Sequence, residues 1–321
     1  MGKMTQDEYF LQAAGRGDFT TVEAMVRQKE VKVDTADELG VTALIRAAER
    51  GDARMTAYLI GKGADVNKKA TATGETALLN ATENNHQEVV QLLLDRGANV
   101  NQNDHHGKTP LMAAVLKNNM QLASKFLKEG ADVNKENIWG QTPLMRSIIN
   151  QNRKLTLLLL ENKANVNQED NKGQTALMYC VHQNDRKTAA LLGIYHADVN
   201  HKDKEGKTAL DLAFDNKDVD MFVYLVKSLG AHHEKMDGKV KFALLTSPEY
   251  QMDVVLNKKD AIEFQKQDAL YNSFVTDSVL LSESAVKTAR VDIFADAFQP
   301  KVIQKASKPL VQNYQVEHIK E

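Results

Sequence analysis

The side chains best suited to covalent chemistry are those of Cys180, the single cysteine of the chain, and the nearby His182. A cysteine nucleophile needs a base, often histidine, that can take its proton. Residues two apart on a helix point to different sides, so this pair does not meet that need in a helix. The spacing therefore does not favour a nucleophile and base at Cys180 and His182.

Metal binding is the second chemistry to consider, because the nine histidines include the adjacent pairs His105-His106 and His232-His233. Zinc sites on helices use two histidines four residues apart, which sequence neighbours cannot provide. A single cysteine also excludes an internal disulfide and a multi-cysteine zinc site. The chain has no phosphate-binding glycine loop, nucleophile elbow or kinase motif set. We expect no metal, no cofactor, no small-molecule substrate and no enzyme activity.

The glycines belong instead to a repeated phrase, Gly-x-Thr-(Ala/Pro)-Leu. Its first residue is 34 positions from the next copy once and 33 positions thereafter, and Ala-(Asp/Asn)-Val-Asn recurs in step with it. A fixed period of this length predicts a solenoid, in which each unit buries its apolar faces against its neighbours. The glycines that begin the phrase are Gly40, Gly74, Gly107, Gly140, Gly173 and Gly206.

Residues 104–136 illustrate how one unit positions its elements. Gly107 marks a turn, Thr109 is a candidate helix N-cap, and Pro110 occupies the first helical position, where its missing N–H costs nothing. Asn118 tolerates the left-handed conformation that ends this helix, and Gly130 ends a second one. Such short helices are marginal in water, so stacking must stabilise them.

This unit resembles the ankyrin repeat, and the resemblance covers about residues 5–231. It implies an all-α solenoid of β-turn fingers and paired antiparallel helices, whose family function is protein–protein recognition. The family pattern has a buried alanine at the position of Cys180, so the resemblance also implies a small core residue with an unreactive thiol there. Residues 1–36 resemble a degenerate capping repeat, and residues 232–321 form a C-terminal segment of unknown fold. The six full repeats are expected at 37–69, 70–103, 104–136, 137–169, 170–202 and 203–231.

The resemblance also implies a partner-binding surface, because fingertips and exposed positions of the first helix form the concave face of ankyrin arrays. Trp139, the only tryptophan, is either an anchor on this face or lies flat on the next finger and shields a turn. The exposed helix positions of the family correspond to Glu49, Asn80 and Ala113, among others, in this sequence. The candidate partner-binding residues are Leu39, Arg46, His105, His106, Leu116, Ile138, Trp139, Arg146, Ile149, Tyr179 and His182.

Two departures from the family pattern concern single positions. Lys163 and His196 replace the loop glycine, and a left-handed conformation there costs about 1 kcal/mol or more. Methionine replaces the histidine that often follows Thr-Pro-Leu, so packing must take over the role of its hydrogen bonds. The resemblance further implies that Asn67, Asn134 and Asn200 match the Asp-Val-Asn setting that asparaginyl hydroxylases modify, the alternative being structural asparagines.

Composition limits the remaining classes. The formal net charge is −2 and 26% of residues are charged, a balance that offers no footprint for nucleic acid or a membrane surface. No run of eighteen apolar residues and no signal segment is found, so we expect a cytoplasmic protein; delivery into a host cell stays open.

In the C-terminal segment, residues 239–244 alternate like a strand, whereas 260–274 and 284–298 are periodic enough for helices. We expect a binding module or adaptor with a protein partner. The alternative is an effector-like multidomain protein whose C-terminal segment carries an unrecognised activity.

Overall fold

The computed structural model describes residues 4–216, 218–229, 231, 240–244 and 252–256. The chain divides into two compact units, residues 1–216 and 217–321. The division falls inside the repeat expected at 203–231, between its two helices. Each unit is therefore described by itself.

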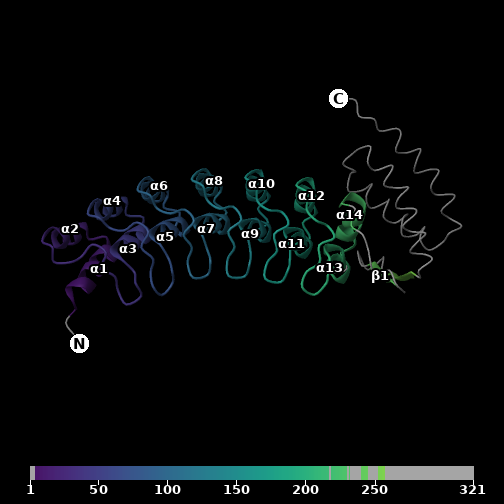
Figure 1. Ribbon diagram of the computed structural model, residues 1–321, viewed down its shortest axis with the longest axis horizontal. Helices are drawn as coiled ribbons and strands as arrows, with labels where there is room; N and C mark the ends of the chain where they lie inside the picture. Colours follow the sequence, from purple (N-terminus) through teal and green to yellow (C-terminus); the bar gives the residue numbers. More distant parts are fainter. Residues whose placement is uncertain (1–3, 217, 230, 232–239, 245–251, 257–321) are drawn as a thin grey trace, which may run out of the picture. The chain divides into compact units, whose positions relative to one another are not determined.

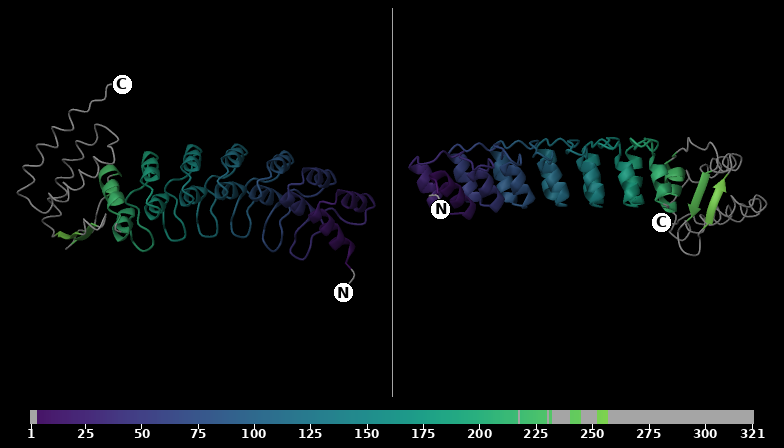
Figure 2. Two further views of the ribbon diagram at one scale, coloured as in Figure 1. Left: turned by 180° about the vertical axis from the view of Figure 1, so that it is seen from behind. Right: turned by 90° about the horizontal axis from the view of Figure 1, so that it is seen from below.

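The first unit is a row of stacked helix pairs, as the 33-residue period predicts. Its odd-numbered helices contact one another in succession and form an inner row; even-numbered helices form an outer row, and finger-like loops project on the other side of the inner row (Figure 1). Figure 2 shows the row from behind and from below. The helices are α1 (Gln6–Arg16), α2 (Phe19–Arg27), α3 (Ala43–Arg50), α4 (Ala53–Gly61), α5 (Ala77–Glu83), α6 (Gln87–Asp95), α7 (Pro110–Leu116), α8 (Met120–Lys128), α9 (Pro143–Ile149), α10 (Arg153–Glu161), α11 (Ala176–His182), α12 (Arg186–Ile194) and α13 (Ala209–Asp215).

The repeated threonine begins the inner helices. In Thr42, Thr76, Thr109, Thr142 and Thr208 the side-chain oxygen accepts a hydrogen bond from the N–H three residues later. Asp or Asn does the same for most outer helices, for example Asn119 for α8. The helix starts expected from sequence are thus confirmed at Thr109 and Pro110.

Left-handed residues end the helices, and several of them are not glycine. Asn118 has a φ of 55°, as expected from its place in the turn between α7 and α8. Lys163 and His196 have φ values of 68° and 63°, so both adopt the strained conformation that glycine adopts in the equivalent Gly130. The predicted departures at these two positions are confirmed.

The core of the array consists of the apolar positions of the repeated phrase. The leucine that ends each phrase is buried, as are Met112, Met145 and Met178, which follow it in three adjacent repeats. Packed methionines therefore occupy the position where histidine is common. Cys180 is fully buried, and this burial raises the pKa of its thiol, which confirms its interpretation as a core residue.

The second unit contains α14 (Val219–Leu229), β1 (Val240–Leu244) and β2 (Met252–Leu256). The strands pair antiparallel, with Val240 opposite Leu256 and Leu244 opposite Met252. The strand expected at residues 239–244 is confirmed, whereas β2 was not expected. The helices expected at 260–274 and 284–298 lie outside the described residues. Within the described part of the chain, no helix combines the length and apolarity needed to cross a membrane.

Candidate functional site

The tips of the fingers are joined into one continuous ridge by backbone hydrogen bonds between neighbouring repeats. The N–H of Ile138 donates to the carbonyl of His106 at 3.0 Å, and that of Asn171 donates to the carbonyl of Trp139 at 3.0 Å. The same bond joins the N–H of Lys204 to the carbonyl of Lys172 at 3.0 Å. Side chains on the tips are therefore held at a fixed spacing by the main chain.

Every finger except the second is shaped by an acid or amide at its base and a glycine after its tip. Asp104 Oδ1 accepts from the N–H groups of His106 and Lys108 at 2.9 and 2.8 Å. Gly107 has a φ of 76°, and a Cβ there would lie 2.7 Å from the Cα of Asn137 in the next finger. Only glycine fits this close approach, which explains why the phrase begins with it.

The second finger differs because it carries one extra residue. Ala70 replaces the acid at the base, and the N–H of Gly74 bonds to the Ala70 carbonyl at 2.8 Å, which closes a wider turn. The N–H of Ala72 still reaches the Leu39 carbonyl at 3.0 Å, and that of His105 reaches the Thr73 carbonyl at 2.8 Å. The insertion therefore enlarges one tip without interrupting the ridge.

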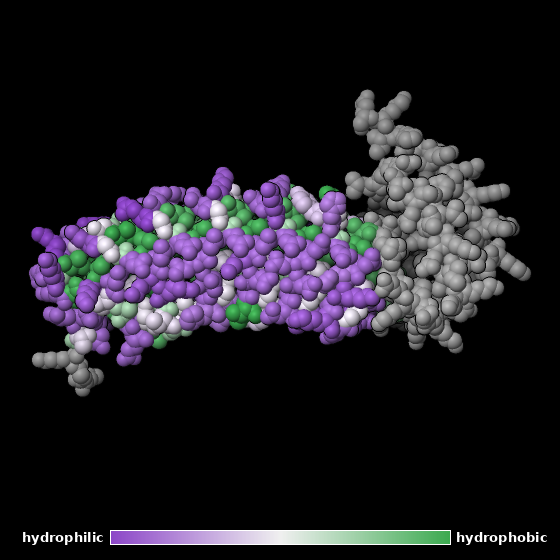
Figure 3. Space-filling model, viewed as in Figure 1, coloured by the Kyte–Doolittle hydropathy of each residue, from purple (hydrophilic) through white to green (hydrophobic). Residues whose placement is uncertain are grey.

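The fourth finger carries the apolar tip. Ile138 and Trp139 are 50% and 56% exposed, and an apolar patch lies on the finger edge near the middle of the array (Figure 3). The Trp139 ring lies parallel to that of His106, with centroids 6.3 Å apart and planes 7° apart. The contact is therefore with the preceding finger, not the next, and it leaves more than half of Trp139 accessible.

Behind the tips, a hydrogen-bonded network joins the fourth and fifth repeats. The Tyr179 hydroxyl donates to Asp170 Oδ2 at 2.7 Å and lies 2.8 Å from Gln141 Nε2, which donates to it. Arg146 Nη1 donates to Gln141 Oε1 at 3.2 Å. Burial, followed by the hydrogen bond to Asp170, raises the pKa of Tyr179 to about 12. Tyr179 is half-buried, and its hydroxyl serves the array itself.

His182 lies one turn after Tyr179 on α11 and packs edge-to-face on it, with centroids 6.4 Å apart. Its Nε2 lies 3.3 Å from Gln174 Nε2. Partial burial lowers the pKa of His182, and the nearby Lys172 lowers it further, against an opposing effect of Asp203. His182 is thus neutral near pH 7, and Lys172 lies close enough to influence it.

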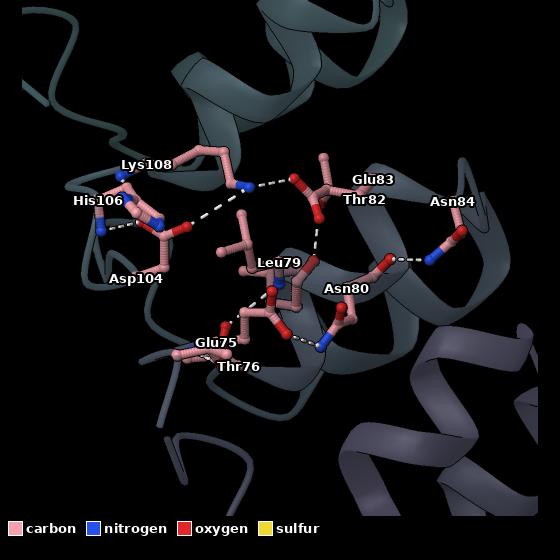
Figure 4. A network of polar contacts seen from close by, with 12 residues as sticks. Glu75, Thr76, Leu79, Asn80, Thr82, Glu83, Asn84, Asp104, His106 and Lys108 are labelled. Carbon is pink, nitrogen blue, oxygen red and sulfur yellow. Dashed lines mark hydrogen bonds and ion pairs between the residues drawn. The ribbon is translucent and has the colours of Figure 1, made fainter. Parts of the chain in front are cut away.

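A second network joins the second and third repeats (Figure 4). Lys108 Nζ lies 2.5 Å from Glu83 Oε1 and 3.4 Å from Asp104 Oδ2. Burial alone would lower the pKa of Lys108, but the two carboxylates outweigh it and raise that pKa. The position after the repeated glycine, which also holds Gln141, was not among the expected site residues, although its polar side chains beside the fingertips could have indicated it.

Two positions expected to be exposed are buried. Asn80 is 7% exposed and Ala113 is 1% exposed. The Ala113 side chain is a single methyl group, and the Asn80 amide donates to Glu75 Oε2 at 3.4 Å. At the same position, Arg46 extends far enough to form an ion pair with Asp37 at 2.6 Å.

The other expected residues are spread along the array. His105 and His106 are exposed on the third fingertip, and Leu116 and Ile149 are half-buried at the ends of α7 and α9. Leu39 is 57% exposed, but it lies on the first finger, in the same repeat as Arg46. The structure therefore brings most of the candidate residues together in the third to fifth repeats and leaves Leu39 and Arg46 apart.

The loop asparagines tie adjacent repeats together. Asn67 Oδ1 accepts from the N–H of Asn99 at 2.7 Å, and its Nδ2 donates to the carbonyl of Gly97 at 3.2 Å. Asn134 Oδ1 accepts from the N–H of Asn165 at 2.7 Å. The N–H of Asn200 donates to Asp198 Oδ1 at 3.0 Å. At Asn67 and Asn134 the side chains thus have a structural role.

The part of the chain that the structure describes contains no group of three or more His, Cys, Asp or Glu side chains placed to hold a metal ion. A comparison with protein-family models does identify the repeats. The model described as "Ankyrin repeats (3 copies)" matches residues 10–104, 98–170 and 167–237, which is more than half of the chain.

Proposed function

Because the chain belongs to the ankyrin-repeat family, whose arrays generally serve as protein–protein interaction modules, we propose that it is an adaptor that binds a protein partner on its finger face. We define the finger face as the fingertip ridge together with the exposed side chains of the inner helices. Members of this family are typically not enzymes, which agrees with an adaptor role.

The observation that carries this proposal is the apolar tip of the fourth finger. A tryptophan that is 56% exposed, beside an isoleucine that is 50% exposed, presents a large apolar area to solvent on a backbone held by hydrogen bonds. Energetically dominant interface residues are enriched in tryptophan, tyrosine and arginine near the interface centre. Trp139 is therefore proposed as the anchor, with Ile138 and His106 as its neighbours.

The half-buried residues behind the tip contribute in a different way. Arg146 and Tyr179 hold Gln141 and Asp170, so they fix the shape of the surface that a partner would meet. Leu116 and Ile149 supply partly exposed apolar area on the inner helices. A preorganised surface of this kind loses little side-chain entropy on binding.

The test is affinity capture with the full-length chain as bait, followed by measurement of the dissociation constant for each captured partner. We expect Trp139→Ala to weaken binding by about 2 kcal/mol or more, because truncating an anchor removes most of its buried contact. Glu49→Ala is the control, since Glu49 is exposed on α3 in the first full repeat, away from the fourth finger, and should change binding little.

Circular dichroism of both variants establishes that the array is intact. Small and equal effects of the two substitutions on every partner would refute the assignment of Trp139 as the anchor.

A further inference from the structure

The fingertip ridge changes chemistry along its length. We call the tips of the third to sixth fingers the central ridge. Its residues, in order, are His105 and His106, Ile138 and Trp139, Asn171 and Lys172, and Lys204 and Glu205. The sequence of tips thus runs from histidine, through an apolar pair, to lysine.

The lysines of the central ridge lack carboxylate partners among the described residues. Lys172 is exposed and forms no ion pair there. Lys204 Nζ donates to the backbone carbonyl of Asn171 at 2.8 Å, which places its ammonium on the neighbouring tip. An ammonium has three donors, so this bond leaves Lys204 able to bind a further acceptor. The two lysines therefore follow Trp139 on the next two tips, and the ammonium of Lys204 lies against the tip that carries Lys172.

The acids of the same fingers are already engaged. Asp104, Asp170 and Asp203 are buried, and each accepts hydrogen bonds from N–H groups of its own finger. On the limbs that lead to the tips, Glu136 bonds Gln168 and Glu169 lies 3.6 Å from His201. Glu205, the one acid of the central ridge, differs: it is 77% exposed and lies 3.7 Å from Lys207, whose closer partner is Asp215 at 2.9 Å.

Arg146 adds to the positive character behind the ridge. Its guanidinium donates to Gln141, a neutral amide, and forms no ion pair with a described carboxylate. The surface after Trp139 therefore favours a negatively charged neighbour.

We infer that the partner segment bound on the central ridge is an extended acidic peptide, with one large apolar side chain on Ile138 and Trp139 and carboxylates that follow onto Lys172 and Lys204. This inference rests on the proposed function and adds the chemistry of the partner. The apolar residue supplies buried area, and the carboxylates set the direction in which the segment lies along the fingers.

The test uses fluorescein-labelled synthetic dodecapeptides and the full-length chain. The first peptide has a central Leu-Phe followed by three glutamates; in the second and third, glutamine or lysine replaces the glutamates. We expect the acidic peptide to bind about tenfold more tightly than the glutamine peptide at low salt, with the difference shrinking at high salt.

Variants of the ridge separate the two parts of the site. Trp139→Ala should weaken the acidic peptide about thirtyfold, whereas Ile194→Ala, at an exposed apolar residue on the outer helix α12, should have no effect. The double substitution Lys172→Glu and Lys204→Glu should abolish the preference for the acidic peptide and create one for the lysine peptide. Circular dichroism establishes that each variant is folded. The double substitution Lys172→Gln and Lys204→Gln removes the two positive charges without introducing negative ones.

The outcomes distinguish this inference from the proposed function. Equal binding of the acidic and glutamine peptides, still dependent on Trp139, would overturn the inference and leave the adaptor proposal standing. Failure of all three peptides would also overturn the inference, and capture of a partner that depends on Trp139 would then still support the adaptor. Tighter binding of an oligothymidylate than of the acidic peptide would overturn the inference in favour of a single-stranded nucleic acid.

Discussion

Lys163 adopts a left-handed backbone conformation in a loop where glycine would avoid the strain. Lys163 has a φ of 68°, whereas at the equivalent Gly63, Gly97 and Gly130 a Cβ would meet nothing within 4 Å. The cost of a side chain there is thus conformational and not steric. A left-handed L-residue costs about 1–2 kcal/mol, and glycine loses about 0.5–1 kcal/mol through its greater unfolded-state freedom.

We therefore expect Lys163→Gly to stabilise the array by about 0.5–1 kcal/mol. Chemical unfolding followed by circular dichroism measures the change. Gly130→Lys is the reverse control and should destabilise by a similar amount. A Lys163→Gly variant that is less stable than the parent would mean that the lysine makes a contact worth more than its strain.

The loop asparagines allow a second prediction at this scale, which rests on family resemblance. We expect an asparaginyl hydroxylase to add one oxygen to Asn67, Asn134 or Asn200, each of which follows an Asp-Val pair. Because Asn67 and Asn134 bridge neighbouring repeats, modification requires local opening of the loop. Mass spectrometry of the peptides after incubation with enzyme is the measurement, with Asn101 and Asn167 as internal controls that follow Asn-Val. Unmodified peptides at all three asparagines would refute the prediction.

At the scale of elements, α11 begins differently from its neighbours. The Thr175 hydroxyl makes no cap hydrogen bond, and its buried Oγ1 has no partner among the described residues. Thr142 caps α9 through a 3.3 Å bond to the N–H of Met145. Both threonines are 1% exposed, so they differ in hydrogen bonding and not in burial.

We expect Thr142→Ala to destabilise the array by about 1 kcal/mol more than Thr175→Ala. Removing Thr142 leaves a helix N–H without its partner, whereas removing Thr175 deletes a hydroxyl that is buried without one. Urea unfolding of the two variants, compared with the parent, measures the difference. A larger loss for Thr175→Ala would show that its hydroxyl is hydrogen-bonded in solution.

At the scale of the whole molecule, the array is proposed to fold without residues 232–321. Each repeat contacts only its neighbours, so the loss of a distant segment does not remove contacts within the first five repeats. We expect the fragment 1–231 to keep its helical circular dichroism and to unfold cooperatively on heating. An unfolded fragment would show that the C-terminal segment is integral to the array; the full-length chain measured in parallel is the reference.

The sequence by itself determined the repeat and most of its local structure. The threonine cap at Thr109 and the left-handed Asn118 follow from rules that act within a few residues. The left-handed Lys163 and the buried Cys180 were expected from the resemblance to the ankyrin repeat. Six copies in phase then require stacking, because no single unit can bury its own apolar faces.

Only the tertiary structure decided which exposed positions share a surface and which are covered. Asn80 and Ala113 are buried although their places in the repeat suggested exposure. The contact of Trp139 with His106 and the network from Arg146 to Asp170 connect residues of different repeats. Their geometry depends on side-chain length and on how closely neighbouring fingers approach. A 33-residue period specifies that repeats are neighbours, but it does not specify how far each side chain reaches across the boundary between them.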